Sequence, residues 1–313
     1  MIRSINVTQL TRRRFFTQSI RFITAGLMVP HMIEPRLVAS AKSSSEQDHG
    51  WQIGCYTRPW AQYDYRVALD AIVEAGFKSV GLMTCQSKTG VVISVDTTLE
   101  EAHEVGNEVQ ARGLRIPSVY GGGFTLDTLQ EAIGSLQTLI DNSAAAGGKS
   151  LLLAGNSTPS LDTRYYKTIA ECADYAAEKK VQLVLKPHGG SNATGPQCRR
   201  IVQNLGHDNF RLWYDPGNTF YYSEGKVDPA DDAATVNGIV TGICIKDYLH
   251  PKNVMVTPGD GEVDFPAVFA HLKAGGFTHG PLIIETLTPG DPPALFKEAI
   301  KARQFVEQLV DES

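Results

Sequence analysis

The sequence has few cysteines, and none of them form the close pairs that hold a structural zinc ion. Its 313 residues include five widely spaced cysteines, with no C-x-x-C pair: Cys55, Cys85, Cys172, Cys198 and Cys244. Zinc knuckles and small disulfide-rich folds depend on closer, paired spacings. The cysteine pattern therefore argues against a disulfide framework and leaves room for a bridge or two at most.

The sequence also lacks an excess of positive charge and a long apolar run. The formal net charge is −5, and no basic stripe occurs in the body of the chain. Nucleic-acid binding usually requires such a stripe. No run of apolar residues reaches the roughly 18 needed to span a bilayer. We therefore expect no nucleic-acid partner, and no membrane association once a leader has been removed.

The remaining composition is that of an ordinary soluble globular protein. Apolar residues make up 42% of the chain and charged residues 20%. These values suit a chain with a sizeable core. A length of 313 residues fits one large barrel or two ordinary domains, and does not choose between them.

The first fifty residues have the pattern of an export leader. Thr11-Arg12-Arg13-Arg14-Phe15-Phe16 resembles the bacterial twin-arginine signal, an apolar stretch covers 20–33, and Ala39-Ser40-Ala41 offers small residues for cleavage. A charged start, an apolar middle and a small-residue end are the parts of a signal peptide. The alternative is a basic tail without structure. We expect residues 1–41 to be a cleavable signal peptide and 42–50 a Ser-rich linker. The partner would then be the twin-arginine export machinery, and the location periplasmic or otherwise exported.

From Trp51 onward, short apolar runs alternate with longer amphipathic segments. The runs predict strands at 52–56, 79–83, 116–120, 150–154, 182–186, 211–214, 242–246 and 282–285. The amphipathic segments predict helices at 65–75, 99–112, 126–146, 163–180, 266–274 and 293–310, with a weaker pattern at 229–236. Nearly continuous apolar strands are typical of a parallel sheet that is covered on both faces.

Eight such repeats favour a (β/α)₈ TIM barrel over 51–313, as a single α/β domain. Strand–helix alternation implies right-handed crossovers, and about 260 residues match the usual barrel size. A doubly wound open sheet is the main competitor. It would normally carry a glycine-rich phosphate loop after the first strand. Here that position reads Cys55-Tyr56-Thr57-Arg58-Pro59-Trp60, with no G-x-G-x-x-G.

Polar and ionisable residues gather where the predicted strands end, which is where barrel enzymes carry their active sites. The later strands end on Lys186 and His188, Asp215 and Asn218, Cys244 with Lys246 and Asp247, and Glu285. The earlier strands end near Tyr56 and Arg58, Thr84 and Cys85, Ser118 and Tyr120, and Gly155-Asn156. A single strand-end Asp is usually a cap or a turn residue. Four consecutive strands ending this way indicate a site for a polar substrate.

The ordered set of strand-end motifs resembles the xylose isomerase-like barrels, a family of sugar phosphate isomerases and epimerases. The motifs are LVLKPHGG, LWYDPGN, ICIKDY, PGDGEVDF and GPLIIE, within about 52–310. The resemblance implies a small-molecule sugar, keto-sugar or glycoside as substrate. In the sugar epimerases of this family, a Glu, an Asp, a His and a Glu from strands five to eight hold a divalent ion. The two Glu residues move a proton next to a carbonyl.

Two of these four ligand positions differ in this chain. Asp215 matches the strand-six ligand and Glu285 the strand-eight ligand, whereas Lys186 stands in place of the strand-five Glu and Cys244 in place of the strand-seven His. One interpretation is that His188 takes over, giving a metal set of His188, Asp215, Glu285 and Cys244 for Mn, Zn, Co or Mg. The other is that no ion binds and Lys186 supplies a fixed positive charge.

The resemblance and the strand-end positions together give a set of candidate site residues. We expect Glu285, Lys186 and His188 to be catalytic, and Tyr56, Arg58, Tyr120, Asn218 and Lys246 to bind substrate. Lys246-Asp247 could equally be an ion pair at a strand end. Tyr221-Tyr222, expected in the loop after strand six, could stack on a sugar or pack on the barrel. Asp260 and Asp264 have the pattern of a turn residue and a helix N-cap.

Three classes of function follow. The first is an exported, metal-dependent sugar isomerase or epimerase that abstracts a proton next to a carbonyl. The second uses the same chemistry followed by loss of a leaving group, as in a 3-keto-glycoside lyase or hydrolase. The third is a non-catalytic sugar-binding barrel, which would bind no metal and consume no substrate. An endonuclease-like activity would need a basic face and more metal ligands. Oligomerisation stays open.

Overall fold

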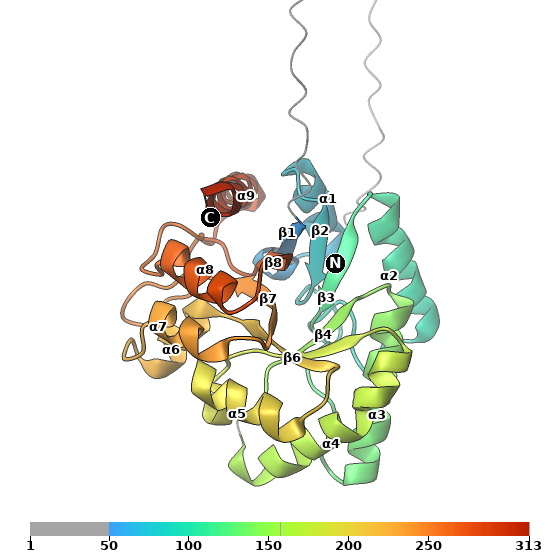
Figure 1. Ribbon diagram of the computed structural model, residues 1–313. Coiled ribbons are helices and arrows are strands. Elements are labelled where there is room, and N and C mark those ends of the chain that lie inside the picture. The colour runs from blue at the N-terminus through green and yellow to red at the C-terminus, as the bar shows by residue number, and fades with distance from the viewer. Residues whose placement is uncertain (1–49, 157, 313) are drawn as a thin grey trace, which may run out of the picture. The chain divides into compact units, whose positions relative to one another are not determined.

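Eight parallel strands close into a barrel in the computed structural model, which describes residues 50–156 and 158–312 (Figure 1). Each strand pairs with the next in sequence, and β8 pairs with β1. The strands are β1 Trp51–Tyr56, β2 Ser79–Leu82, β3 Arg115–Val119, β4 Ser150–Leu153, β5 Gln182–Leu185, β6 Phe210–Tyr214, β7 Val240–Ile245 and β8 Gly280–Ile284. The predicted TIM barrel is confirmed. The predicted signal peptide lies outside the described residues, as does the linker except for Gly50.

Helices surround the strands on the outside of the barrel (Figure 1). The α-helices are α1 Tyr65–Glu74, α2 Leu99–Ala111, α3 Leu129–Ala145, α4 Pro159–Glu178, α5 Gly195–Leu205, α6 Pro216–Ser223, α7 Pro229–Ala233, α8 Phe265–Ala274 and α9 Pro292–Glu312. Three short 3₁₀ helices are η1 Arg58–Trp60, η2 Gly190–Asn192 and η3 Ala234–Val236. Within the described part of the chain, no helix has the length and apolar character to cross a membrane.

Two helices, α5 and α6, were not among the sequence predictions, and local capping explains why they form. Thr194 and Gln197 form a capping box at the start of α5, and Gly206 ends it in the left-handed conformation. The side chain of Asp215 caps α6 by accepting the backbone N–H of Asn218 at 2.9 Å. Tyr221 and Tyr222 therefore lie on α6, and the loop predicted for them is wrong.

Side chains alternate between two apolar regions along each strand, because successive strand residues face opposite sides of a sheet. On β5, β6, β7 and β8 the last strand residue belongs to the outer core between barrel and helices: Leu185, Tyr214, Ile245 and Ile284. The residue before it belongs to the core inside the barrel: Val184, Trp213, Cys244 and Ile283. The residue that follows each strand therefore turns toward the barrel axis. Those four residues are Lys186, Asp215, Lys246 and Glu285.

Candidate active site

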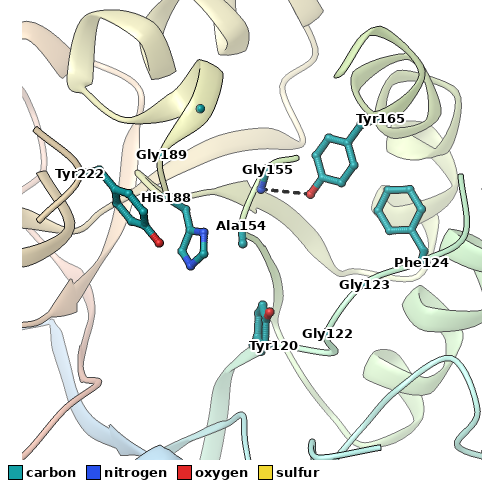
Figure 2. A pocket seen from close by; sticks show the side chains of 11 residues that line it. Tyr120, Gly122, Gly123, Phe124, Ala154, Gly155, Tyr165, His188, Gly189 and Tyr222 are labelled. Atoms are coloured by element: carbon teal, nitrogen blue, oxygen red, sulfur yellow. Dashed lines mark hydrogen bonds between the residues drawn. The ribbon is translucent and has the colours of Figure 1, made fainter. Parts of the chain in front are cut away.

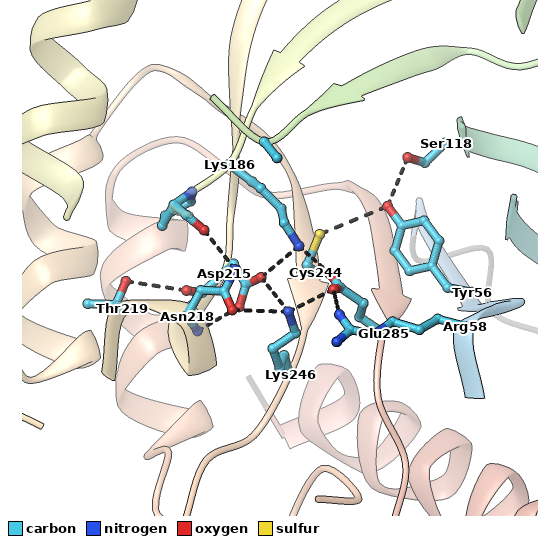
Figure 3. A network of polar contacts seen from close by, with 12 residues as sticks. Tyr56, Arg58, Ser118, Lys186, Asp215, Asn218, Thr219, Cys244, Lys246 and Glu285 are labelled. Atoms are coloured by element: carbon cyan, nitrogen blue, oxygen red, sulfur yellow. Dashed lines mark hydrogen bonds and ion pairs between the residues drawn. The ribbon is translucent and has the colours of Figure 1, made fainter. Parts of the chain in front are cut away.

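Glu285 is the centre of a buried cluster of charged side chains at the C-terminal ends of the later strands (Figure 3). Its Oε2 accepts Lys186 Nζ at 2.6 Å, and its Oε1 lies 2.7 Å from Lys246 Nζ. Arg58, on η1 after the first strand, also donates to Oε1. Three cations from three parts of the chain therefore meet on one carboxylate.

Asp215 is held by the same two lysines. Its Oδ2 lies 3.2 Å from Lys186 Nζ and 3.2 Å from Lys246 Nζ. Its Oδ1 is used for the cap of α6. Asn218 joins the cluster as well, because its Oδ1 accepts Lys246 Nζ at 3.1 Å while its Nδ2 donates to the Pro187 carbonyl at 2.8 Å. The two carboxylates and the two lysines form one connected network.

The network is almost completely closed to solvent and carries a net positive charge. Asp215 and Glu285 are 0% exposed, and Lys186 and Lys246 are 3% and 2% exposed. Arg58 is the accessible member, with 31% of its side chain exposed. Three cations against two carboxylates leave a formal charge of +1. Buried charges of this kind are stable only when they are paired.

The pKa values of the network follow from this arrangement. Burial alone would raise the pKa of Glu285, but the charges of Lys186, Lys246 and Arg58 hold it well below its usual range. Burial would lower the pKa of Lys186, but Glu285 and Asp215 raise it. Burial lowers the pKa of Lys246, and the charges of Lys186 and Arg58 lower it further, so that Asp215 and Glu285 offset only part of the shift. Glu285 is therefore an anion at neutral pH and a weak base.

Inside the barrel, Tyr56 and Cys244 pack in the apolar core next to the network. The Tyr56 hydroxyl donates to Ser118 Oγ at 2.8 Å and lies 3.9 Å from Cys244 Sγ. Burial raises the pKa of the Tyr56 hydroxyl and of the Cys244 thiol well above their usual ranges. Both side chains are 0% exposed. Tyr56, predicted to bind substrate, is thus part of the barrel interior and does not line the pocket.

A solvent-open pocket of about 390 Å³ lies over the ends of β3, β4 and β5 (Figure 2). Its lining combines aromatic rings with glycines: Tyr120, Gly122, Gly123, Phe124, Ala154, Gly155, Tyr165, His188, Gly189, Gly190 and Tyr222. Phe124 and Tyr165 stack with ring centroids 5.1 Å apart. Aromatic walls with few polar groups are typical of sites that bind small polar molecules. Tyr120 is the predicted substrate-binding residue that reaches this pocket.

His188 connects the pocket with the charged network. The residue is exposed, and its ring points into the pocket beside Tyr222, with ring centroids 5.1 Å apart, while the protein on its other sides excludes much of the water around the ring (Figure 2). The protein around the ring disfavours its charged form, and the ammonium groups of Lys186 and Lys246 repel a further positive charge. Together these effects lower the pKa of His188 to about 4. The imidazole is therefore neutral and available as a base at neutral pH.

A divalent ion does not fit this arrangement of side chains. Donor atoms of Asp215, Cys244 and Glu285 lie within 4.8 Å of one another, which is close enough for shared ligation. However, ammonium groups already bind Asp215 Oδ2 and both oxygens of Glu285. His188, the fourth ligand expected from the sequence, is not part of this group. An ion could enter only if at least one lysine left.

The remaining predicted residues have structural partners. Lys246 and Asp247 do not pair with each other. Lys246 turns inward, whereas Asp247 accepts backbone N–H groups at 2.8–3.1 Å and so holds the loop between β7 and α8. Asp264 caps α8 through the N–H of Ala267 at 3.0 Å, as predicted. Asp260 pairs with Lys301 on the surface.

Sequence reasoning missed two pocket walls, Phe124 and Tyr165. Phe124 directly follows the glycine run 121–123, in the segment after β3. A glycine run between a strand end and an aromatic residue is a usable signal for a binding loop. Tyr165 lies within α4 and is indistinguishable by pattern from core residues of that helix. Only its position over Gly155, whose N–H it accepts at 3.3 Å, places it at the pocket.

Comparison with known proteins gives a family match over most of the chain. Residues 69–306 match the family described as Xylose isomerase-like TIM barrel. A curated relative, inosose dehydratase from Geobacillus thermodenitrificans, is 25% identical over an alignment of 243 residues that covers 63% of this chain and 77% of that protein. The family match, over residues 69–306, includes β2 to β8 and so the strands that lead into Lys186, Asp215, Lys246 and Glu285.

Solved structures of similar fold include sugar epimerases. D-psicose 3-epimerase from Clostridium cellulolyticum superposes with a TM-score of 0.67 at 14% identity, covering 83% of this chain and 99% of the epimerase. A 3-keto-D-glucoside 4-epimerase from E. coli gives a TM-score of 0.61 at 16% identity, covering 82% and 99%. At these identities the likeness shows the fold.

Proposed function

Because the chain belongs to the xylose isomerase-like TIM barrels, we propose that it is a sugar-modifying enzyme that removes a proton from the carbon next to a sugar carbonyl. The observation that carries the proposal is the position of His188. It is a neutral base that faces the pocket and lies in the field of a net positive network. The epimerases of the same fold support a sugar as the substrate class.

The network suits the negative charge that proton removal creates. When a proton leaves the carbon beside a carbonyl, the electrons move onto the carbonyl oxygen and form an enolate. Fixed positive charge near that oxygen stabilises the transition state more than the ground state. Arg58 is the partly exposed cation of the network, so its guanidinium is the group that can reach the oxygen. Glu285 holds Arg58 through an ion pair, and Lys186 and Lys246 in turn hold Glu285 in place.

Proton return decides the product. If His188 returns the proton to the former carbonyl carbon, and the hydroxyl proton of the deprotonated carbon moves to the former carbonyl oxygen, the product is an isomer with a shifted carbonyl. Return to the opposite face of the same carbon gives an epimer and needs a second proton donor. Among the described residues of the pocket wall, the tyrosines Tyr120, Tyr165 and Tyr222 are the other groups that carry a transferable proton.

Hydrogen exchange in heavy water tests this proposal directly. The protein is incubated with unphosphorylated ketoses such as D-fructose, D-psicose and D-tagatose, and deuterium next to the carbonyl is followed by NMR. His188→Gln should slow exchange by about 10²- to 10⁴-fold, the usual contribution of a general base. His271→Gln, an exposed histidine on α8, is the matched control and should exchange at the normal rate. Unchanged exchange in His188→Gln would rule out His188 as the base.

Elimination from a 3-keto-glycoside is the second candidate. Both carboxylates of the network are bound by lysines, so His188 is the base that the pocket offers, and one base is enough for an elimination. Loss of the group beside the new enolate would then complete a lyase reaction. Two similar proteins have names that point to keto-sugar-like substrates. One is named an inosose dehydratase and the other a 3-keto-D-glucoside 4-epimerase. Aglycone release from a 3-keto-glycoside, without sugar epimerisation, distinguishes the lyase.

The third candidate function is not enzymatic: the barrel would bind a sugar without converting it. It predicts that a sugar binds in calorimetry while no deuterium enters the sugar and no product forms. The aromatic pocket alone would satisfy that function. The charged network would then have no role beyond stability. Apolar side chains would fill the end of the barrel without the desolvation cost of buried charges.

Export belongs to the same proposal. The twin-arginine pattern at Thr11–Phe16 supports delivery of the folded enzyme to the periplasm, where free sugars and glycosides are the accessible substrates. Replacing Arg12 and Arg13 with lysine should keep the unprocessed chain inside the cell. Cell fractionation of this variant and of the wild type measures the effect. Equal distribution of both proteins would remove the export proposal and leave the enzymatic one intact.

A further inference from the structure

We infer that the ammonium groups of Lys186 and Lys246 occupy the place of a divalent metal ion, so that this barrel works without one. The structural part of this inference is independent of the reaction. The catalytic role of the lysine pair, as the source of positive charge for an enolate, rests on the function proposed above.

The first support is that every carboxylate oxygen of the network already has a donor. Glu285 Oε2 is bound by Lys186, and Oε1 by Lys246 and Arg58. Asp215 Oδ2 is bound by both lysines at 3.2 Å, and Oδ1 accepts the N–H of Asn218. Both lysines thus bridge the two carboxylates, as a shared ion would. A divalent ion would need the same oxygens.

The second support is the charge balance. Two ammonium groups carry the charge of one divalent ion, and they carry it at the same two carboxylates. Adding an ion beside them and Arg58 would place five positive charges against two negative ones. The side chains of Lys186, Lys246, Asp215 and Glu285 are at most 3% exposed, so solvent would screen little of that repulsion.

The third support is that neighbouring residues are fitted to Lys246. Asn218 Oδ1 accepts its third hydrogen bond, in addition to the two carboxylate contacts. Gly217, at the start of α6, packs directly on the lysine. A Cβ at Gly217 would lie 2.8 Å from Lys246 Cγ and 2.7 Å from the Lys246 carbonyl oxygen. The same Cβ would lie 2.8 Å from the Asp247 carbonyl oxygen, so the start of α6 can pack on this backbone and on the Lys246 stem together only because residue 217 has no side chain.

Cys244 also fits this inference. Its side chain belongs to the apolar core inside the barrel with Trp213 and Ile283. Its polar neighbour in that core is the Tyr56 hydroxyl, at 3.9 Å. A thiol in apolar surroundings packs as a small hydrophobic group. The nearness of Cys244 to the two carboxylates is thus explained by its position on β7.

Metal analysis of the wild-type protein is the primary test. The purified chain is dialysed separately against Mn²⁺, Zn²⁺, Co²⁺ and Mg²⁺, freed of excess ion, and analysed by inductively coupled plasma mass spectrometry. Thermal unfolding is recorded with each ion and with a chelator. We expect metal contents well below one ion per chain and an unchanged Tm, because a bound ion would raise Tm by mass action. About one ion per chain, with a Tm that falls on chelation, would overturn the inference.

A pair of variants tests whether the lysine is what excludes the ion. Lys186→Glu replaces an ammonium group with a carboxylate and creates an acidic cluster with Asp215, Glu285 and Cys244. Lys186→Met removes the same charge without adding a ligand. Lys186→Glu should bind Mn²⁺ or Zn²⁺ in titration calorimetry, with Lys186→Met weaker and the wild type silent. Equal behaviour of the two variants would contradict the inference, and if Lys186→Glu does not fold, the wild-type measurement decides.

The outcome for the metal is separate from the outcome for the function. A metal-free wild type that exchanges sugar protons supports both proposals. A metal-free wild type without exchange removes the proposed function and leaves the structural part of the inference standing. A wild type that binds one ion and loses exchange on chelation overturns the inference while the proposed function survives.

Discussion

The two halves of the barrel rim differ in charge and in access to solvent. The rim over β3 and β4 consists of glycines and aromatic rings around an open pocket. The rim over β5 to β8 consists of lysines and carboxylates that are closed to solvent. His188, which follows β5, contacts the first region and lies in the electric field of the second. Under the proposed function, the open side would bind the substrate and the closed side would supply the charge.

This division has an energetic reason. Aromatic rings and glycines can line an open pocket at little cost, because they do not need partners when the ligand is absent. Buried charges cannot be left unpaired, so a cluster that supplies a positive field must be built as a closed network. A site that needs both features therefore has to separate them.

The largest effect is expected from breaking the charged half. Glu285→Gln leaves Lys186, Lys246 and Arg58 against the single charge of Asp215. Removing one partner from a buried charge network usually costs about 3–5 kcal/mol of stability. Urea unfolding should show this loss, and sugar proton exchange should disappear. Asp260→Asn breaks a surface pair with Lys301 and should cost less than about 1 kcal/mol. Similar losses for both variants would show that the network does not stabilise the fold.

The second effect concerns His188, which lies between the two halves of the rim, and the pH dependence of proton exchange. Because the pKa of His188 is lowered to about 4, its ring stays neutral well below the ordinary histidine value. The rate constant for proton exchange should therefore be flat from neutral pH down to about pH 5 and fall only below about pH 4. Its pH profile, measured as kcat/KM, gives the midpoint directly. A midpoint near the ordinary value of about 6.5 would mean that neither the burial of the ring nor the lysines lower the pKa of His188.

The pH dependence of stability has a defined sign at the same residue. Between about pH 4 and 6.5 the unfolded chain binds a proton at His188 while the folded chain does not. The contribution of His188 to stability therefore falls as the pH is lowered through this window. Urea unfolding of the wild type and of His188→Gln from pH 7 to 4 measures it, and the difference between the two curves should be constant near neutral pH and change only at lower pH.

A smaller effect is expected where the floor of the pocket meets the network. Gly155 has φ +83°, and a Cβ there would lie 2.4 Å from Asn192 Oδ1. Asn192 in turn donates to the Lys186 carbonyl at 2.7 Å. Gly155→Ala should cost about 1–3 kcal/mol in urea unfolding. Gly134→Ala, in open space within α3, is the control and should stabilise by about 0.5–1 kcal/mol. A neutral Gly155→Ala would show that this contact can relax.

The smallest effect is expected in the open half. Tyr222 packs its ring on His188 and over Gly189, where a Cβ would lie 2.7 Å from the ring. If the ring also stacks on a sugar, Tyr222→Ala should raise KM by roughly two- to tenfold, the range of one aromatic contact. Tyr222→Phe keeps the ring and should leave KM nearly unchanged. A large kcat loss in Tyr222→Phe would instead identify the hydroxyl as a proton donor.

The sequence alone determined the fold and the residues at the strand ends. Nearly continuous apolar runs and eight strand–helix repeats are local patterns, so they are visible without coordinates. They predict the barrel, and they place Lys186, Asp215, Lys246 and Glu285 near the axis. Short polar helices such as α6 escape such patterns, because their formation depends on a single cap, here Asp215.

Only the tertiary structure decided which of these side chains meet. Lys186 and Glu285 are 99 residues apart in the chain, and their contact exists because the barrel closes and sets the stagger of its strands. The sequence left Lys186 and His188 as alternatives for one position. The fold separates them, since the Lys186 side chain enters the barrel while the chain turns at Gly189 and leaves His188 in the pocket. Register and closure are properties of the whole sheet, and no short stretch of sequence contains them.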